Sequence, residues 1–161
     1  MNETKNYIDI LVDSLEKKYN TLVKIEEIEK KQEDVLLGKK VSATEFNDLF
    51  DEKGKYIEKL EELDLGFEKL YERVKEELGD NKDTYKEEIL AMQDLIRKIS
   101  DLTVSLQARQ NRNKEKYMAF FSNKKQEIKQ FKMSSKTVSN YYKNMYNSHQ
   151  EGSSYFLDKK K

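Results

Sequence analysis

The 161-residue chain contains no cysteine, proline or tryptophan, only five glycines and a single histidine, His149. Without cysteine it can form neither a disulfide scaffold nor a thiolate metal site. One histidine nearly excludes a histidine-based metal site or a catalytic triad. Because proline interrupts helices, its absence from so charged a chain favours long, continuous helices.

Long apolar runs are also missing. No stretch approaches the roughly 18 apolar residues that a transmembrane helix needs. Residues 1–10 lack the basic start and the apolar stretch of a secretory signal. We therefore expect no membrane insertion.

Charge is balanced in total, with 31 basic and 31 acidic residues, but it is unevenly distributed. Residues 1–79 carry 14 basic and 21 acidic residues, a net charge of −7, so residues 80–161 carry +7. Residues 109–143 hold ten Lys and Arg against two acidic residues, a pattern that could follow a phosphate backbone. The opposite charge of the N-terminal half favours an intramolecular partner instead, so we expect no nucleic-acid binding.

Apolar residues at spacings of three and four predict helices at residues 4–37 and 82–132, and a short one at 135–147. A further helix starts at the capping box Ser42-Ala43-Thr44-Glu45 and ends at the turn Gly79-Asp80-Asn81. The seam of this helix, the stripe of mostly apolar residues that would face a partner helix, has alternating spacings of three and four residues over four heptads. Lys53 is the one charged residue in that seam, and we expect it to pair with a carboxylate across it.

These elements predict an all-α fold, an elongated left-handed bundle of three long antiparallel helices plus a short C-terminal helix and flexible tail. Residues 1–132 would form the bundle domain, and residues 133–161 the short helix and the tail. Polar residues in the seam of the third long helix would fix its register at a cost in stability.

The third long helix is expected to outreach the second. At about 1.5 Å per residue, the helix at 82–132 extends roughly 20 Å beyond its partner. An apolar face there needs cover from the tail, a second copy or a client helix, although such a stripe most often belongs to a core. The candidate client-binding residues on and after this overhang are Tyr117, Phe120, Phe121, Ile128, Phe131, Val138 and Met145.

No constellation of catalytic or cofactor-binding residues is present. The acidic clusters Glu26-Glu27-Glu29 and Glu61-Glu62-Asp64 lack the spacing of a calcium loop, and we expect them on solvated helix faces. No nucleophile elbow or phosphate-binding glycine loop occurs. We therefore expect a protein that is not an enzyme and that uses no cofactor or metal.

Short segments spread over most of the chain carry a family resemblance. They are Ile25-Glu26-Glu27-Ile28-Glu29; Phe46-x-x-Leu49-Phe50-Asp51-Glu52-Lys53 with Ile57-x-x-Leu60-x-x-Leu63; Arg112-Asn113 with Tyr117 and Phe120-Phe121; Tyr141-Tyr142; and Phe156-Leu157-Asp158-Lys159-Lys160. In this order they resemble the flagellar export chaperone family FlgN, clostridial type.

The resemblance implies a cytoplasmic type III export chaperone. Such a protein binds the C-terminal amphipathic helices of the hook–filament junction proteins FlgK and FlgL and delivers them to the export gate protein FlhA. The resemblance also implies that a C-terminal tyrosine docks at the gate. By position this is Tyr141 or Tyr142, followed here by Lys143 where the family version has glycine, and Tyr155 is the third candidate.

Two other interpretations stay open. A FliT-like chaperone of the filament-cap protein would share the all-helical build. A structural coiled coil that self-associates through the overhang would instead form a homodimer with its phenylalanines buried between two copies.

Overall fold

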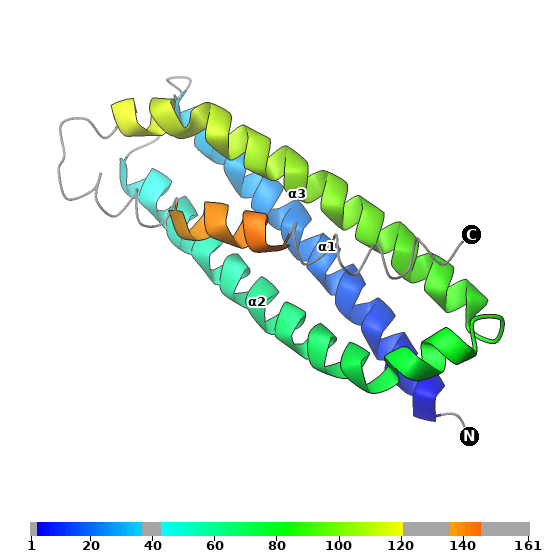
Figure 1. The fold of residues 1–161 in the computed structure, drawn as a ribbon. Coiled ribbons are helices and arrows are strands. Elements are labelled where there is room, and N and C mark those ends of the chain that lie inside the picture. Colours follow the sequence, from blue (N-terminus) through cyan, green and yellow to red (C-terminus); the bar gives the residue numbers. More distant parts are fainter. Residues whose placement is uncertain (1–2, 37–42, 121–135, 146–161) are drawn as a thin grey trace.

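The structure, a computed structural model, describes residues 3–36, 43–120 and 136–145. These residues form α1 (Glu3–Leu36), α2 (Ala43–Asp80), α3 (Lys86–Phe120) and a short helix at residues 136–145, which we call the docked helix. Successive long helices run in opposite directions, and the docked helix lies alongside them, between α2 and α3 (Figure 1). The predicted all-α class is confirmed.

The first helix is the centre of the packing. Both α2 and α3 pack against α1, whereas the backbones of α2 and α3 make no helix–helix contact within the described residues. The stripe predicted for this helix is its buried face, which holds Ile8, Leu11, Leu15, Leu22 and Ile25. Burial of each such side chain contributes about 1.5–3 kcal/mol relative to exposure, so this stripe is a major part of the core.

The seam of α3 follows the predicted register closely. From Met92 to Tyr117 every predicted seam position is buried, polar members included: Met92, Ile96, Ile99, Thr103, Leu106, Gln110, Asn113 and Tyr117. In α2 the fully buried seam positions are Phe46, Lys53, Leu60 and Val74. The three-and-four spacing therefore predicted the buried face of α3 correctly and that of α2 in part, because Ile57 and Leu78 are buried outside the predicted seam.

Helix boundaries agree with the sequence at α2 and differ at α3. The second helix begins directly after the predicted cap residue Ser42 and ends at Asp80. The third begins at Lys86 rather than at residue 82, because residues 81–85 form a turn in which the Tyr85 N–H donates to the Asn81 carbonyl (3.2 Å). Tyr85 is buried, so the turn is itself anchored in the core.

The described part of α3 ends level with the start of α2. Near that end, the Tyr117 ring packs against Phe46, with ring centroids 5.4 Å apart, and against Phe50 at 6.4 Å. With Val35 these residues form a small second core cluster. The predicted continuation of the helix over residues 121–132, and with it the predicted overhang, lies outside the described residues.

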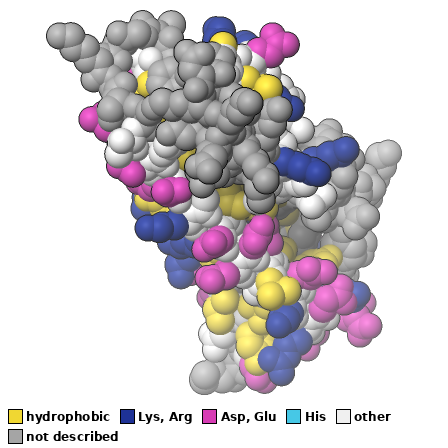
Figure 2. Space-filling view, turned by 90° about the vertical axis from the view of Figure 1, so that its left-hand side faces the viewer, with side chains coloured by type: hydrophobic (Ala, Val, Ile, Leu, Met, Phe, Trp, Pro, Cys, Tyr) yellow, Lys and Arg dark blue, Asp and Glu magenta, His cyan; other side chains and the backbone are white. Residues whose placement is uncertain are grey.

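The outer surface of the described residues mixes both charge signs. Figure 2 shows acidic and basic side chains interspersed, with hydrophobic side chains in small patches between them. None of the described helices has a stretch long and apolar enough to cross a membrane.

Candidate functional site

The docked helix inserts one apolar face into the core of the bundle. Its side chains Val138, Tyr141, Tyr142 and Met145 are buried in the same cluster as residues of all three long helices. A helix of ten residues is about 15 Å long and has little stability alone in water. Its helical form therefore depends on what it packs against, and the short helix predicted at 135–147 is present at 136–145.

Four residues from the three long helices contact the docked helix through polar atoms. Asp64 lies on α2 and Glu29 on α1, and each accepts a hydrogen bond from it. On α3, the Gln110 Nε2 donates to the Ser139 Oγ (3.0 Å), and the Thr103 Oγ1 lies 4.0 Å from the Met145 Sδ. We call Glu29, Asp64, Thr103 and Gln110 the docking surface.

The first polar set is centred on Glu29. The Tyr142 hydroxyl donates to its Oε1 (3.0 Å), and the Lys53 Nζ lies 3.6 Å from the same oxygen. The Lys53 ammonium also donates to the Gln32 Oε1 (3.1 Å) and lies 4.9 Å from the centroid of the Phe50 ring. The side chains of Glu29 and Lys53 are only 1% and 2% exposed, so this is a buried ion pair capped by a phenol.

Burial dominates the electrostatics of this set. Removal from water raises the pKa of Glu29, although Lys53 and the Tyr142 hydroxyl act in the opposite direction. Burial likewise lowers the pKa of Lys53, against the attraction of Glu29. Burial and the adjacent carboxylate raise the pKa of Tyr142 well above its usual value, so its hydroxyl keeps its proton and acts as a donor.

The second polar set is centred on Asp64. The Tyr141 hydroxyl donates to its Oδ2 (2.8 Å), while the Lys18 Nζ donates to its Oδ1 (2.5 Å). Lys18 is buried, and burial lowers its pKa. Burial and Asp64 together raise the pKa of Tyr141, which therefore also stays protonated.

The two sets repeat one arrangement in opposite directions. Each joins an ammonium, a carboxylate and a phenol, but Lys18 of α1 meets Asp64 of α2, whereas Lys53 of α2 meets Glu29 of α1. The two phenols come from consecutive residues of the docked helix. The docked helix is thus hydrogen-bonded to both partners of the α1–α2 pair.

The expectation that both acidic clusters lie on solvated faces is wrong for one member of each. Glu29 is buried, and Asp64 is half-buried and bonded to two side chains, because both stand next to the seam and meet a lysine from the other helix. Their neighbours Glu27, Glu61 and Glu62 are exposed, as expected. Within the described ranges, no group of acidic or histidine side chains could hold a metal ion.

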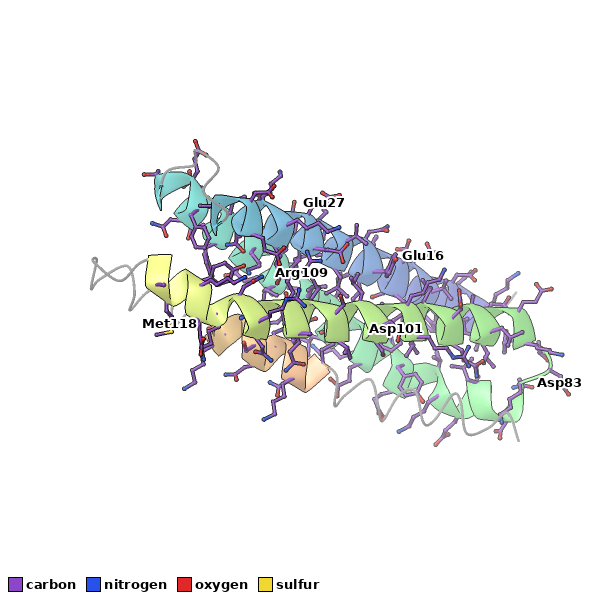
Figure 3. All side chains as sticks on the ribbon, turned by 90° about the horizontal axis from the view of Figure 1, so that it is seen from above. Glu16, Glu27, Asp83, Asp101, Arg109 and Met118 are labelled. Atoms are coloured by element: carbon purple, nitrogen blue, oxygen red, sulfur yellow. The ribbon has the colours of Figure 1, made fainter. Side chains whose placement is uncertain are left out.

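The basic C-terminal half meets the acidic half at α3. The Arg109 Nε lies 3.4 Å from the Glu33 Oε1 of α1, and the Asn113 Nδ2 donates to the same oxygen (2.6 Å). Figure 3 shows Arg109 directed toward α1, while Glu16 and Glu27 extend away from the bundle. This contact is of the intramolecular kind that the charge asymmetry predicted.

The residues proposed as sites from the sequence fall into two groups. Tyr117, Val138, Tyr141, Tyr142 and Met145 are all described and all buried, so none offers a free face in this structure. Phe121, Ile128, Phe131 and Tyr155 lie outside the described residues. The backbone of Phe120 ends α3, but its side chain is not among those described. Glu29, Asp64 and Lys18 were missed as site residues.

Comparison of the chain with protein-family models, with curated proteins and with solved structures finds no match. The likeness to FlgN chaperones therefore depends on the residues quoted above.

Proposed function

We propose that the chain is a FlgN-like type III export chaperone, cytoplasmic and without enzymatic activity. It would bind the C-terminal amphipathic helix of a hook–filament junction protein and deliver it to the export gate protein. We also infer that its bundle is elongated and left-handed, because the three-and-four seam of α2 favours that supercoil.

One observation carries the proposal. The three long helices leave a side on which a short amphipathic helix completes the core, where the backbones of α2 and α3 do not come into contact within the described residues. A surface that buries an amphipathic helix is what an export chaperone needs, and no reactive group is required for that task. The family resemblance and the apolar residues after α3 agree with this role.

The client contact is assigned to the apolar residues that follow Tyr117, namely Phe120, Phe121, Ile128 and Phe131. Gate docking is assigned to Tyr155 as long as the docked helix stays in place, because Tyr141 and Tyr142 are then buried. A strip of four or five buried anchors would give micromolar affinity, about −8 kcal/mol, which suits a transient handover.

Isothermal titration calorimetry with a junction-protein C-terminal peptide tests the proposal. We expect micromolar binding by the full chain, and at least tenfold weaker binding when the four apolar residues after Tyr117 are replaced by alanine. The matched control replaces Leu90 and Val104 of α3 with alanine; these side chains are 45% and 49% exposed. This control variant should bind the peptide as tightly as the natural chain does.

Two results would contradict this assignment. Unchanged affinity in the fourfold variant would remove the client site. Binding of a filament-cap peptide but not of a junction peptide would replace the FlgN-like role with the FliT-like one.

A further inference from the structure

We propose that the docking surface recognises a particular kind of partner: an amphipathic helix with hydrogen-bond donors at two consecutive positions, flanked by apolar anchors. In the docked helix the donors are Tyr141 and Tyr142, and the anchors are Val138 and Met145. The inference rests on the proposed chaperone role and adds this surface, besides the apolar residues after Tyr117, as a second contact for the client helix. The client would sit here in place of residues 136–145.

The docked helix occupies the side of the long helices as a ligand would. It joins α3 through 15 residues, 121–135, and has too few residues to be helical alone. Four of its ten side chains enter the core at spacings of three, four and seven, which is the pattern of a helix laid into a groove. A partner helix of the same pattern meets the same contacts.

The surface offers acceptors where the occupant offers donors. Glu29 and Asp64 each contact a lysine ammonium and also accept a hydrogen bond from a phenol hydroxyl. A purely apolar helix seated here would leave both carboxylates without that donor, at a cost in free energy for the buried one. The surface therefore favours helices that carry phenol, hydroxyl or amide groups at the two middle positions.

Two buried polar atoms, one on the docking surface and one beside it, stay without a partner among the described residues when residues 136–145 are docked. The Glu29 Oε2 and the Gln32 Nε2 are buried, and neither has a hydrogen-bond partner among the described residues. Both groups stand around the Lys53 ammonium. The polar set around Lys53 is therefore not fully satisfied by the described residues while the chain's own helix is docked.

The test uses a fluorescein-labelled peptide with the sequence of residues 134–147 as the probe helix. The protein is the full-length chain carrying Val138→Asp and Met145→Asp, which keeps its own helix from docking. By fluorescence anisotropy we expect binding at least tenfold tighter to this variant than to the natural chain. The peptide carrying Tyr142→Phe should bind at least tenfold more weakly, whereas Asn144→Ala, at an exposed position, should change little.

Three results would overturn the inference. They are equal binding to the variant and the natural chain, absence of binding to both, and equal affinity of the tyrosine and phenylalanine peptides. If circular dichroism shows that the double variant has lost its helices, the titration is made on full-length Tyr142→Phe, whose own helix lacks one donor. The tyrosine peptide should then bind this Tyr142→Phe variant at least tenfold tighter than it binds the natural chain. If it does not, the inference is overturned.

The experiment separates this inference from the proposed function. A junction-protein peptide that fails in calorimetry while the probe binds removes the flagellar role and leaves the docking surface. A junction peptide that binds while the probe fails leaves the role and removes the docking surface as its site.

Discussion

Replacing Lys53 with methionine tests the buried ion pair most severely. The Lys53 and Glu29 side chains are 2% and 1% exposed, so neither charge is solvated by bulk water. Methionine fills most of the space but leaves the Glu29 carboxylate with the Tyr142 hydroxyl as its remaining close donor. Removing one partner of a buried pair costs about 3–5 kcal/mol of unfolding free energy, and we expect a loss in that range.

Urea unfolding, followed by circular dichroism at neutral pH, measures this loss. The midpoint should fall while the slope m is unchanged, because the same surface is exposed on unfolding. The matched control is Lys59→Met at an exposed position of the same helix, which should change stability by less than about 0.5 kcal/mol. A Lys53→Met variant as stable as this control would refute the reasoning.

A double variant separates the ion pair from simple loss of packing. Glu29→Gln with Lys53→Met removes both charges but keeps an acceptor for the Tyr142 hydroxyl. Since uncharged replacements of a whole buried pair are often neutral, we expect the double variant within about 1 kcal/mol of the natural chain. A double variant as unstable as the single one would show that the ammonium's packing, and not its charge, matters.

The pH dependence of the Lys53→Met variant follows from the raised pKa of Glu29. Burial raises that pKa above 4.5, and loss of the ammonium removes the main opposing influence. As pH falls toward this raised pKa, the folded state takes up a proton that the unfolded state does not yet bind, so stability rises. The deficit of the variant relative to the natural chain should therefore shrink between pH 8 and pH 5, as measured by the same urea titrations.

Three further substitutions have expected outcomes. Tyr141→Phe removes the donor to Asp64, which keeps its lysine, and should lower unfolding free energy by about 1 kcal/mol in urea titrations; an unchanged midpoint would contradict the contact. Phe46→Ala removes the phenylalanine ring from the second core cluster and should lower the free energy of unfolding by about 3–5 kcal/mol. A loss below about 1 kcal/mol, as for an exposed ring, would contradict its burial. Gly66→Ala, where an added methyl meets nothing within 4 Å inside α2, should raise unfolding free energy by about 0.5–1 kcal/mol; a lower melting temperature would contradict this.

Much of the fold could be predicted from the sequence because it depends on local signals. The capping box at Ser42 fixed the start of α2, and the three-and-four spacing fixed the buried face of α3 and part of that of α2. The same spacing showed that Lys53 enters the seam, and its carboxylate partner followed from the cost of burying a lone charge. The start of α3 was placed four residues early because the turn at 81–85 depends on burial of Tyr85, which is a tertiary contact.

The site could not be predicted in the same way. Whether the face of Val138 and Met145 meets a client or the chain's own bundle depends on long-range geometry that no local spacing encodes. Glu29 and Asp64 are chemically the same as their exposed neighbours, and only the position of α1 relative to α2 brings each one against a lysine. The resemblance proposed Tyr141 and Tyr142 for gate docking, but their carboxylate partners lie 77 and 113 residues away in the chain.

Glu29 and Asp64 hold residues 136–145 on the bundle. Amide hydrogen exchange of the full-length chain measures this directly, because a free ten-residue helix gives its amides almost no protection. We predict that the amides of residues 140–145 exchange at least a hundredfold more slowly than in an unstructured peptide, corresponding to about 2.7 kcal/mol or more. Exchange of these amides at unstructured rates, while those of α1 and α3 stay protected, would contradict the account.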